Sequence, residues 1–504
     1  MFSKILIANR GEIARRIIIA CRELGIATAA IYADPDANAP YVGMADERYH
    51  LPGTAVTDTY LNRAAIIDIA KKAGAQAIHP GYGFLSENAQ FARDCAEAGL
   101  VFIGPSPDAI EKMGSKAEAR EIARQAGVPV VPGVDGAGMS VDALQTAVAD
   151  MPYPLLIKAS AGGGGKGMRV VWEPAEFADA VRAARREAGS AFGDDRVLVE
   201  RFFTAIHHVE IQVLADEHGQ VLHLFERECS VQRRHQKIIE ESPSPTIGGN
   251  EVLRKHMADA AVSLARAVGY TNAGTVEFIV TADGEFYFLE MNTRLQVEHP
   301  VTELVTGVDL AQWQIRVAAG EKLPFTQADL RQRGHAIECR VYAEDPAAGF
   351  LPSIGEIALW QPPAGPGVRV DSGIETGTAV TPYYDPMMAK IITWGANRQE
   401  AITKMERALR DTVALGVTTN IPYLLDILQE SHFQQGQTPT SYLDKHFEGW
   451  QPSYEPSETD WLAAAANELL GLQGAAKGAA AAGVGESAQP DPWQMGNGWR
   501  NLRP

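Results

Sequence analysis

The chain has 504 residues, and 46% of them are hydrophobic, which allows more buried core than one domain usually holds. We therefore expect two or three domains. The formal net charge of −18 argues against nucleic acid as the main partner, and no apolar run reaches the ~18 residues that a membrane span requires. Four cysteines without metal-ligand spacing suit a reducing compartment and predict a cytoplasmic protein: Cys21, Cys95, Cys229 and Cys339. Cys229 has no obvious acid–base partner nearby in the sequence, so we interpret it as a packing residue.

The first part of the chain, to about residue 114, alternates short apolar stretches with amphipathic helical patterns. The stretches include Ile5 to Ala8, Ala27 to Tyr32 and Ala77 to His79. This alternation predicts a parallel α/β sheet. The segment lacks the pattern G-x-G-x-x-G, so no dinucleotide is implied.

A glycine-rich loop follows the apolar run Pro154 to Ile157 and Lys158, with four consecutive glycines at 162–165. Glycine lets backbone N–H groups close on an oxyanion, which indicates a phosphate site. The loop is not a P-loop, because Lys166 precedes another glycine and the strand-like stretch Met168 to Trp172. We expect a hairpin flap; a glycine turn without a ligand is the alternative.

A second lysine, Lys116, lies in the first turn of a helix whose start is marked by Ser115 and Glu118 in capping-box spacing. A cation there opposes the helix dipole, and an anion bound beside it would offset the penalty. An exposed lysine that points to water is the simpler alternative.

A predicted hairpin carries two acidic residues face to face. The strand Thr275 to Val280 is followed by Asp283-Gly284, which predicts a two-residue turn, and by the strand from Phe286. With that turn Glu277 lies opposite Glu290, and Asn292 shares the face of Glu290. Facing carboxylates repel, and a divalent cation such as Mg²⁺ would compensate. A solvated surface hairpin is the alternative.

Five motifs in this order resemble the biotin carboxylase component of the biotin-dependent carboxylases, within the ATP-grasp superfamily. They occupy residues 4–14, 79–88, 228–237, 290–300 and 334–340, and the resemblance covers roughly residues 1 to 447. It implies a multidomain α/β and α+β fold. The expected parts are an N-terminal parallel α/β (pre-ATP-grasp) domain at 1–114, an ATP-grasp domain at 115–330 with a mobile glycine-rich lid at about 130–203, a β-rich C-terminal domain at 331–447, and an Ala/Gly-rich flexible tail at 448–504.

The resemblance also implies an activity: ATP-dependent carboxylation of biotin with bicarbonate through carboxyphosphate, the first half-reaction of an acyl-CoA carboxylase. Acetyl-CoA is the favoured final acceptor, and propionyl-CoA, methylcrotonyl-CoA and pyruvate are the other candidates. The implied cofactors are ATP, two Mg²⁺ (or Mn²⁺) ions and biotin. No Met-Lys-Met biotin-acceptor motif occurs, so biotin is expected on a separate carrier protein or domain. The expected partners are that biotin carboxyl carrier protein, carboxyltransferase subunits and a second copy of the chain.

Residue roles follow by the same match. Glu298 is the expected general base, and Arg340 stabilises the oxyanion of biotin. The expected bicarbonate ligands are Lys237, Arg294, Gln296, the Val297 backbone and Glu298. The expected metal ligands are Glu277, Glu290 and Asn292. The expected nucleotide contacts are Lys116, Lys158, Gly163, Gly164, Gly165, Gly167, Met168, Glu200, Arg201, Phe203, His208, Gln232 and His235. Tyr82 and Gly83, with Arg340, are expected near biotin.

Three details qualify this set. Arg294, Gln296 and Glu298 share one face if their segment is extended. Arg201 stands where the family pattern has Lys, a change that backbone recognition of adenine would tolerate. Without the neighbouring motifs, Arg340 would be assigned a structural ion pair with Glu338.

Closure of the lid over ATP is predicted, and free and ATP-bound states without movement of the loop 160–168 would contradict it.

Two alternatives to biotin carboxylation stay open. One is another ATP-grasp ligase that joins a carboxylate to an amine, which would turn over ATP with such an acceptor and without biotin. The other is a catalytically silent assembly subunit, which would require the loss of a key residue.

Overall fold

A computed structural model describes residues 1–159, 168–234, 236–453, 458–459, 461–462 and 465–466. Residues Met1–Trp450 form one unit, and Gln451–Pro504 form a second unit, of which only a few residues are described. The expected tail at 448–504 therefore lies mostly outside the described residues. Within the described part of the chain, no helix combines the length and the apolar character that crossing a membrane would need.

The N-terminal part is a parallel sheet with strand order β3-β2-β1-β4-β5, as expected from the sequence. Its strands are β1 (Lys4–Ile7), β2 (Ala27–Ala33), β3 (Glu47–Leu51), β4 (Ala77–His79) and β5 (Val101–Phe102). Its helices are α1 (Gly11–Glu23), α2 (Pro40–Met44), α3 (Arg63–Ala73), α4 (Ala89–Glu97) and α5 (Pro107–Gly114), with the short η1 (Asp34–Asp36). Strands buried on both faces explain the nearly continuous apolar run in β1.

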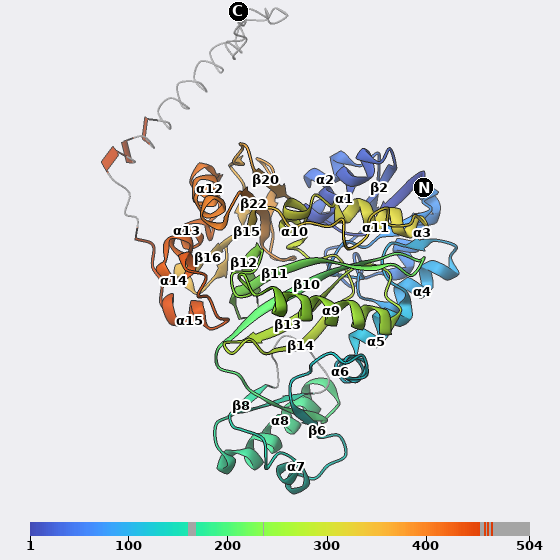
Figure 1. Ribbon diagram of the computed structural model, residues 1–504. Helices are drawn as coiled ribbons and strands as arrows, with labels where there is room; N and C mark the ends of the chain where they lie inside the picture. The colour runs from blue at the N-terminus through green and yellow to red at the C-terminus, as the bar shows by residue number, and fades with distance from the viewer. Residues whose placement is uncertain (160–167, 235, 454–457, 460, 463–464, 467–504) are drawn as a thin grey trace, which may run out of the picture. The chain divides into compact units, whose positions relative to one another are not determined.

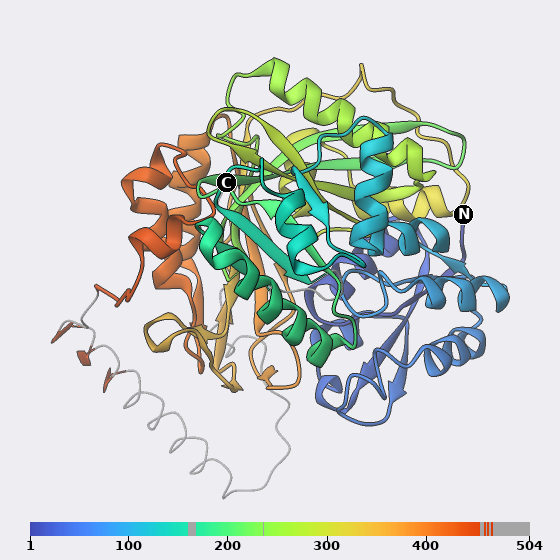
Figure 2. The same ribbon diagram turned by 90° about the horizontal axis from the view of Figure 1, so that it is seen from below.

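A smaller sheet with order β6-β9-β7-β8 follows α6 (Lys116–Gln125) and falls within the range expected for the lid. Its strands are β6 (Gly133–Asp135), β7 (Leu155–Ala159), β8 (Arg169–Val171) and β9 (Val197–Arg201). Helices α7 (Val141–Ala147) and α8 (Phe177–Phe192) accompany it, with η2 (Pro174–Glu176), and Figure 2 shows α8 beside the strands. These elements share a hydrophobic cluster of their own, which includes Leu144, Leu155, Phe177 and Val197.

The largest sheet has the order β14-β13-β10-β11-β12-β15-β22-β20 (Figure 1). Its strands are β10 (Ile206–Ala215), β11 (Val221–Arg233), β12 (Gln236–Ser242), β13 (Asn272–Thr281), β14 (Phe286–Asn292), β15 (His335–Tyr342), β20 (Val368–Ser372) and β22 (Met387–Gly395). Because β12 pairs with β15, the boundary expected at 330/331 falls inside a single sheet.

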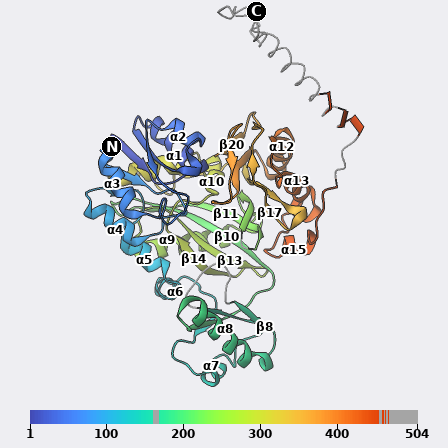
Figure 3. The same cartoon turned by 180° about the vertical axis from the view of Figure 1, so that it is seen from behind.

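Helices cover this sheet on both faces. The helices are α9 (Glu251–Val268), α10 (His299–Thr306), α11 (Leu310–Ala318), α12 (Arg398–Asp411), α13 (Ile421–Gln429), α14 (Ser431–Gln434) and α15 (Tyr442–His446). The remaining short elements are the pairs β16 (Glu344–Asp345) with β17 (Leu351–Pro352), β18 (Gly355–Glu356) with β21 (Ala379–Val380), and β19 (Leu359–Gln361) with β23 (Val413–Leu415), and η3 (Pro346–Ala348). Figure 3 shows α1 and α10 beside β20 and the neighbouring strands.

Alternation along β10 places the polar residues of the site. Val209, Ile211 and Val213 pack with α9 in one hydrophobic cluster. Successive strand residues point to opposite faces, so His208, Glu210 and Gln212 point to the other face of the sheet. All three are buried, and their polar atoms need partners there.

Candidate active site

The hairpin of β13 and β14 places Glu277 opposite Glu290, which confirms the predicted pairing. The predicted two-residue turn is wrong, because the loop closes between Thr281 and Glu285 and Gly284 has a positive φ of 80°. A bulge between Glu277 and Phe278 and their partners then shifts the register by one residue. The longer loop and the bulge cancel each other, so the acidic pair lies where the simpler hairpin would have put it.

Glu290 is available to a ligand. It makes no hydrogen bond or ion pair with any residue that the structure describes, and solvent reaches its side chain. The protein around its carboxylate limits hydration, and with the charge of Glu277 this raises the pKa of Glu290. A divalent cation would relieve both effects, so this donor pair fits Mg²⁺.

Glu277, in contrast, is already paired. Its carboxylate lies 3.0 Å from Lys237 Nζ and 3.0 Å from His208 Nε2. Burial alone would raise the pKa of Glu277, but the charges of Lys237 and His208 hold it well below its usual range. His208 was predicted on the ribose side of the nucleotide, and the structure places it beside Glu277, one of the predicted metal ligands.

Lys237 lies at the centre of the site. It lies near the start of β12, opposite Gln232 of β11. Its Nζ donates to Glu298 Oε1 at 2.7 Å, Glu210 Oε2 at 2.8 Å and Glu277 Oε1 at 3.0 Å. Its side chain is only 12% exposed. Burial opposes the charged form, but these carboxylates raise the pKa of Lys237 well above its ordinary value. The ammonium group therefore joins Glu277, a predicted metal ligand, to Glu298, the predicted base.

Arg294 is held at the edge of the same cluster. Its guanidinium donates to Asn292 Oδ1 at 2.9 Å, Gln296 Oε1 at 2.8 Å and Glu87 Oε2 at 2.9 Å. Gln296 in turn donates to Glu277 Oε1 at 3.1 Å. Glu87 comes from the N-terminal part of the chain and was missed by the sequence analysis, although it lies in one of the matched motifs.

Glu298 is fully buried and lies at the start of α10, but its side chain does not cap that helix. Instead it meets Lys237, and Arg340 at 3.0 Å on its other oxygen. Burial would raise its pKa, yet Lys237, Arg340 and Arg227 hold the pKa of Glu298 well below its usual range. The backbone turns at residues 297–298, so the three predicted side chains converge without the fully extended segment that the sequence analysis assumed.

Arg340 does not pair with Glu338, which corrects the simplest expectation. It contacts Glu240 and Glu298, while neither carboxylate oxygen of the buried Glu338 has a hydrogen-bond partner among the described residues. Glu240 and Glu338 face each other across β12 and β15. Burial raises the pKa of Glu240 to about 7 and that of Glu338 well above its usual range.

Sequence reasoning also missed buried partners of Lys237 and Glu298. Arg227 is fully buried and donates to Glu210 at 2.5 Å and to Gln212 at 2.6 Å. Cys229 was expected to lack an acid–base partner, but its Sγ lies 3.8 Å from Glu298 Oε1. The polar residues at alternate positions of β10 could have indicated these buried partners. One of them, Glu210, lies opposite Glu277 of β13.

The predicted nucleotide contacts are only partly described. Gly163, Gly164, Gly165, Gly167 and His235 lie outside the described residues, whereas Met168 is described and partly buried just before β8. Lys158 contacts Glu200, which also contacts Arg120, a residue not predicted. Burial, together with the charges of Arg120 and Lys116, lowers the pKa of Lys158 to about 8. A bound anion would restore it.

The predicted adenine hinge follows β9. Arg201 N–H donates to Pro132 O and Phe202 N–H donates to Pro154 O, each at 2.9 Å, so these two donors are already used. The Phe203 ring stacks on Tyr287 at 5.4 Å and lies 4.6 Å from the Arg201 guanidinium carbon. The Arg at position 201 therefore packs on the aromatic pair while the hinge backbone keeps its strand geometry.

Tyr82 and Gly83 lie on a loop after β4, which Asn9 holds through donations to Pro80 O at 2.6 Å and Tyr82 O at 2.8 Å. The Tyr82 hydroxyl contacts Glu12 of α1. Burial raises the pKa of Tyr82 well above its ordinary value, and the nearby charge of Arg340 acts in the opposite direction. The loop thus approaches the Arg340 side of the site.

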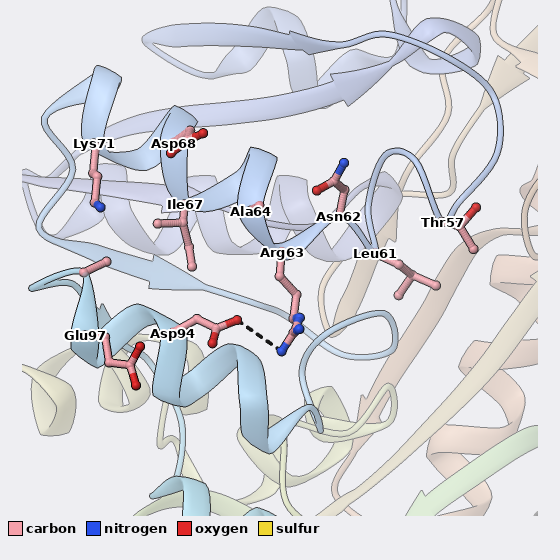
Figure 4. Close-up of a pocket in the computed structure, with 11 residues that line it drawn as sticks. Thr57, Leu61, Asn62, Arg63, Ala64, Ile67, Asp68, Lys71, Asp94 and Glu97 are labelled. Atoms are coloured by element: carbon pink, nitrogen blue, oxygen red, sulfur yellow. Dashed lines mark ion pairs between the residues drawn. The ribbon is translucent and has the colours of Figure 1, made fainter.

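A separate hollow of about 740 Å³ lies between α3 and α4 (Figure 4). The ion pair of Arg63 and Asp94, 3.1 Å long, crosses it. None of the predicted site residues lines this hollow.

Family models match three parts of the chain: biotin carboxylase, N-terminal domain (residues 1–110), carbamoyl-phosphate synthase L chain, ATP binding domain (115–326), and biotin carboxylase C-terminal domain (338–445). Biotin carboxylase 1 of Bacillus subtilis is 52% identical over 88% of this chain and 99% of its own length. Methylcrotonoyl-CoA carboxylase subunit alpha of Dictyostelium discoideum is 49% identical over 93% of this chain and 67% of its own length. Other relatives are named for propionyl-CoA carboxylase and pyruvate carboxylase, at 51% and 50% identity.

A solved structure shows the same fold. The biotin carboxylase domain dimer of Hydrogenobacter thermophilus 2-oxoglutarate carboxylase, in complex with MgADP, ADP and bicarbonate, superposes with a TM-score of 0.84. It is 47% identical over 90% of this chain and all of that chain. The sequence motifs, the fold and these matches all indicate the same family. The chain belongs to the biotin carboxylase family of ATP-grasp enzymes.

Proposed function

We propose that this biotin carboxylase transfers a carboxyl group from bicarbonate to biotin on a carrier protein, at the cost of ATP, through the residues described above. The observation that carries the proposal is the contact of Lys237 with Glu277 and Glu298. One ammonium group thereby connects a carboxylate pair suited to Mg²⁺ with a buried carboxylate suited to act as a base.

Bicarbonate is the first substrate to place. Lys237 and Arg294 are the two cations proposed to hold it, and the guanidinium of Arg294 matches a planar anion better than an ammonium would. Gln296 lies between them, within hydrogen-bond distance of both Arg294 and Glu277. These groups can hold bicarbonate with one oxygen directed at the γ-phosphate of ATP, which supplies proximity to a weak nucleophile.

Glu298 is the proposed general base. Its low pKa keeps it ionised but makes it a weak base while Lys237 and Arg340 both pair with it. Bicarbonate would share Lys237, and the pKa of Glu298 would then rise toward a value better suited to proton transfer. As Glu298 accepts the proton, the bicarbonate oxygen bonds to the γ-phosphorus and the bond to ADP breaks, which gives carboxyphosphate.

Glu277 and Glu290 would hold Mg²⁺, with Asn292 beside them. Bound there, the ion supplies charge neutralisation at the transferring phosphate. The charge of Lys116 acts on the pKa of Glu290, and the charge of Glu290 acts on the pKa of Lys158, so both lysines lie near Glu290. They would bind the phosphates of the nucleotide.

Arg340 is the proposed stabiliser of biotin. Carboxyphosphate breaks down to CO₂ and phosphate. The phosphate takes the proton from the ureido nitrogen of biotin, and this nitrogen bonds to the carbon of CO₂ while negative charge develops on the ureido oxygen. A guanidinium already fixed by Glu240 and Glu298 can stabilise that charge without reorganisation. Tyr82 and Gly83 would border the bound biotin.

The test is ADP release by the purified chain with MgATP, with and without bicarbonate and with and without free biotin. We expect turnover that requires bicarbonate and rises with biotin. Turnover that requires an amine acceptor and ignores biotin would support a different ATP-grasp ligase, and no turnover under any condition would favour a silent subunit.

The final acceptor is proposed to be an acyl-CoA, with acetyl-CoA as the first candidate from the sequence. The relatives named above point to methylcrotonoyl-CoA, propionyl-CoA and pyruvate at nearly equal identity. Reconstitution with carrier and carboxyltransferase subunits, and labelled bicarbonate with each of the four acceptors, tests the choice. We also propose a cytoplasmic homodimer; the dimer in the Hydrogenobacter structure supports the oligomeric state.

A further inference from the structure

Lys390 lies in β22 and is completely buried, which is rare for a lysine. Its Nζ donates to the carbonyl oxygen of Val297 at 2.8 Å and lies 3.3 Å from Glu12 Oε1 and 3.7 Å from Asp371 Oδ2. These partners come from three distant parts of the chain. A buried ammonium is costly unless such partners compensate it.

The sheet register places Lys390 next to the proposed chemistry. In β15 its partner is Arg340, and in β20 its partner is Asp371. Paired residues of neighbouring strands share a face, so Lys390 and Arg340 point to the same side of the sheet. Lys390 nevertheless takes no part in the mechanism proposed above.

The Val297 carbonyl is the informative contact. Val297 lies between Gln296 and Glu298, and its carbonyl belongs to the peptide plane that joins it to Glu298. A charge-assisted hydrogen bond from a buried ammonium fixes the orientation of that plane. It thereby fixes the point from which the Glu298 side chain reaches Lys237 and Arg340, and this side chain is not anchored by capping α10.

The other charges around Lys390 keep it protonated. Burial lowers the pKa of a lysine, but Glu12, Glu338 and Asp371 outweigh it, so the pKa of Lys390 is raised. Arg369 lies near and opposes this effect, while it also pairs with Asp371 at 2.8 Å. The donor to Val297 is thus charged at neutral pH.

We propose that Lys390 is a positioning residue that holds the 296–298 turn through the Val297 carbonyl and so sets the geometry of the bicarbonate site. The inference rests on the proposed function. It differs from a purely structural role, because loss of the contact should affect bicarbonate use while the ATP side, formed by other strands, stays unchanged.

The main variant is Lys390→Met, which keeps the length and removes the charge. We expect the KM for bicarbonate to rise, or kcat to fall, by roughly 10- to 100-fold, since displacement of a reacting group by about 1 Å can have such an effect. The KM for MgATP and the rise in Tm caused by MgATP should stay within about twofold of the parent. Lys255→Met, a surface lysine that is 73% exposed, is the matched control and should behave as the parent.

Glu12→Gln separates the ion pair from the Val297 contact. It keeps Lys390 on the carbonyl and should leave the KM for bicarbonate near the parental value. The double variant Lys390→Met/Glu12→Gln leaves less unpaired charge in the core, and it should still show the bicarbonate defect.

Four results would overturn the inference. The first is a folded Lys390→Met with parental bicarbonate kinetics, and the second is an equal loss for bicarbonate and MgATP. The third is a Glu12→Gln defect as large as that of Lys390→Met. The fourth is failure of both Lys390 variants to fold, which would make the residue a structural one. A parent chain without bicarbonate-dependent turnover would overturn the proposed function as well, so the two failures are distinguishable.

Discussion

Glu290 is the proposed metal ligand whose substitution should leave folding intact. It makes no hydrogen bond or ion pair with the described residues, so Glu290→Gln should change the free energy of unfolding by no more than about 0.5 kcal/mol. Loss of one carboxylate should raise the Mg²⁺ concentration needed for half-maximal ADP release by at least roughly tenfold. Magnesium titrations of ADP release, with urea unfolding in parallel, measure both quantities.

Asp283→Asn is the control, because it removes an exposed acid from the loop of the same hairpin. Its magnesium titration should match that of the parent. A Glu290→Gln variant with the same magnesium requirement as the parent would remove Glu290 from the metal site.

Arg294 is the cation whose loss should be specific for bicarbonate. Arg294→Ala removes the donor that bridges Asn292 and Gln296, so we expect bicarbonate-dependent ADP release to fall by roughly 10²- to 10³-fold. Arg182→Ala, in an exposed pair with Asp179, should have no effect. Near-parental turnover of Arg294→Ala at limiting bicarbonate would refute the assignment.

At the scale of elements, Glu241 joins β12 to β15 and α12. It accepts from His335 at 2.6 Å and from Arg398 at 2.7 and 3.0 Å. Burial opposes ionisation, but Arg398 and His335 lower the pKa of Glu241 from 4.5 to about 2. A carboxylate whose pKa is depressed on folding stabilises above its unfolded pKa and loses that contribution as the pH falls through the folded pKa.

The shift predicts about 3 kcal/mol of stability at neutral pH, lost between about pH 5 and about pH 2. Arg398→Gln should therefore be less stable than the parent at pH 7, and the difference should shrink as the pH falls toward 3. Urea unfolding at several pH values measures it, with Arg407→Gln in the exposed pair with Asp411 as the control. A difference that stays constant with pH would show that Arg398 acts only through packing.

The hairpin of β13 and β14 shows which structural features the sequence pattern predicts and which it does not. The alternation of β13 and β14 predicted which residues share a face, and the pairing of Glu277 with Glu290 is confirmed. The loop length was wrong, since one extra residue in the loop is compensated by a bulge that no local pattern announces. Spacing along the chain is also a poor guide to the partners of Arg340. The ion pair with Glu338 that spacing alone would suggest is not formed, and Arg340 instead contacts Glu240 of β12, roughly 100 positions away in sequence.

At the scale of the molecule, the site exists only because distant segments meet. Glu87 of the N-terminal part holds Arg294, and Lys390 of β22 holds Val297. The motifs identified most of the residues that meet in the proposed site. The residues that fix them, such as Arg227 and Lys390, depend on the order of strands in the large sheet, which spacing along the chain does not reveal.

The extent of the folded unit gives the last prediction. The hydrophobic clusters of the described residues end with Trp450. Its indole N–H donates to Asp426 at 2.7 Å, and its ring centroid lies 5.2 Å from that of Tyr423. Phe447 also contacts Tyr423, at 5.5 Å. A chain of residues 1–450 should therefore keep the parental Tm and ADP release.

A chain of residues 1–446 loses both aromatic rings from the cluster around α13 and should be less stable by about 3 kcal/mol or more. Its remaining activity at low temperature should still depend on bicarbonate, because α13 and Tyr423 lie outside the set of residues proposed to form the active site. Thermal unfolding of the two truncated chains and of the full chain measures the difference in stability. A stable 1–446 chain would show that the packing of Phe447 and Trp450 contributes little, and an unfolded 1–450 chain would show that the fold requires residues beyond Trp450.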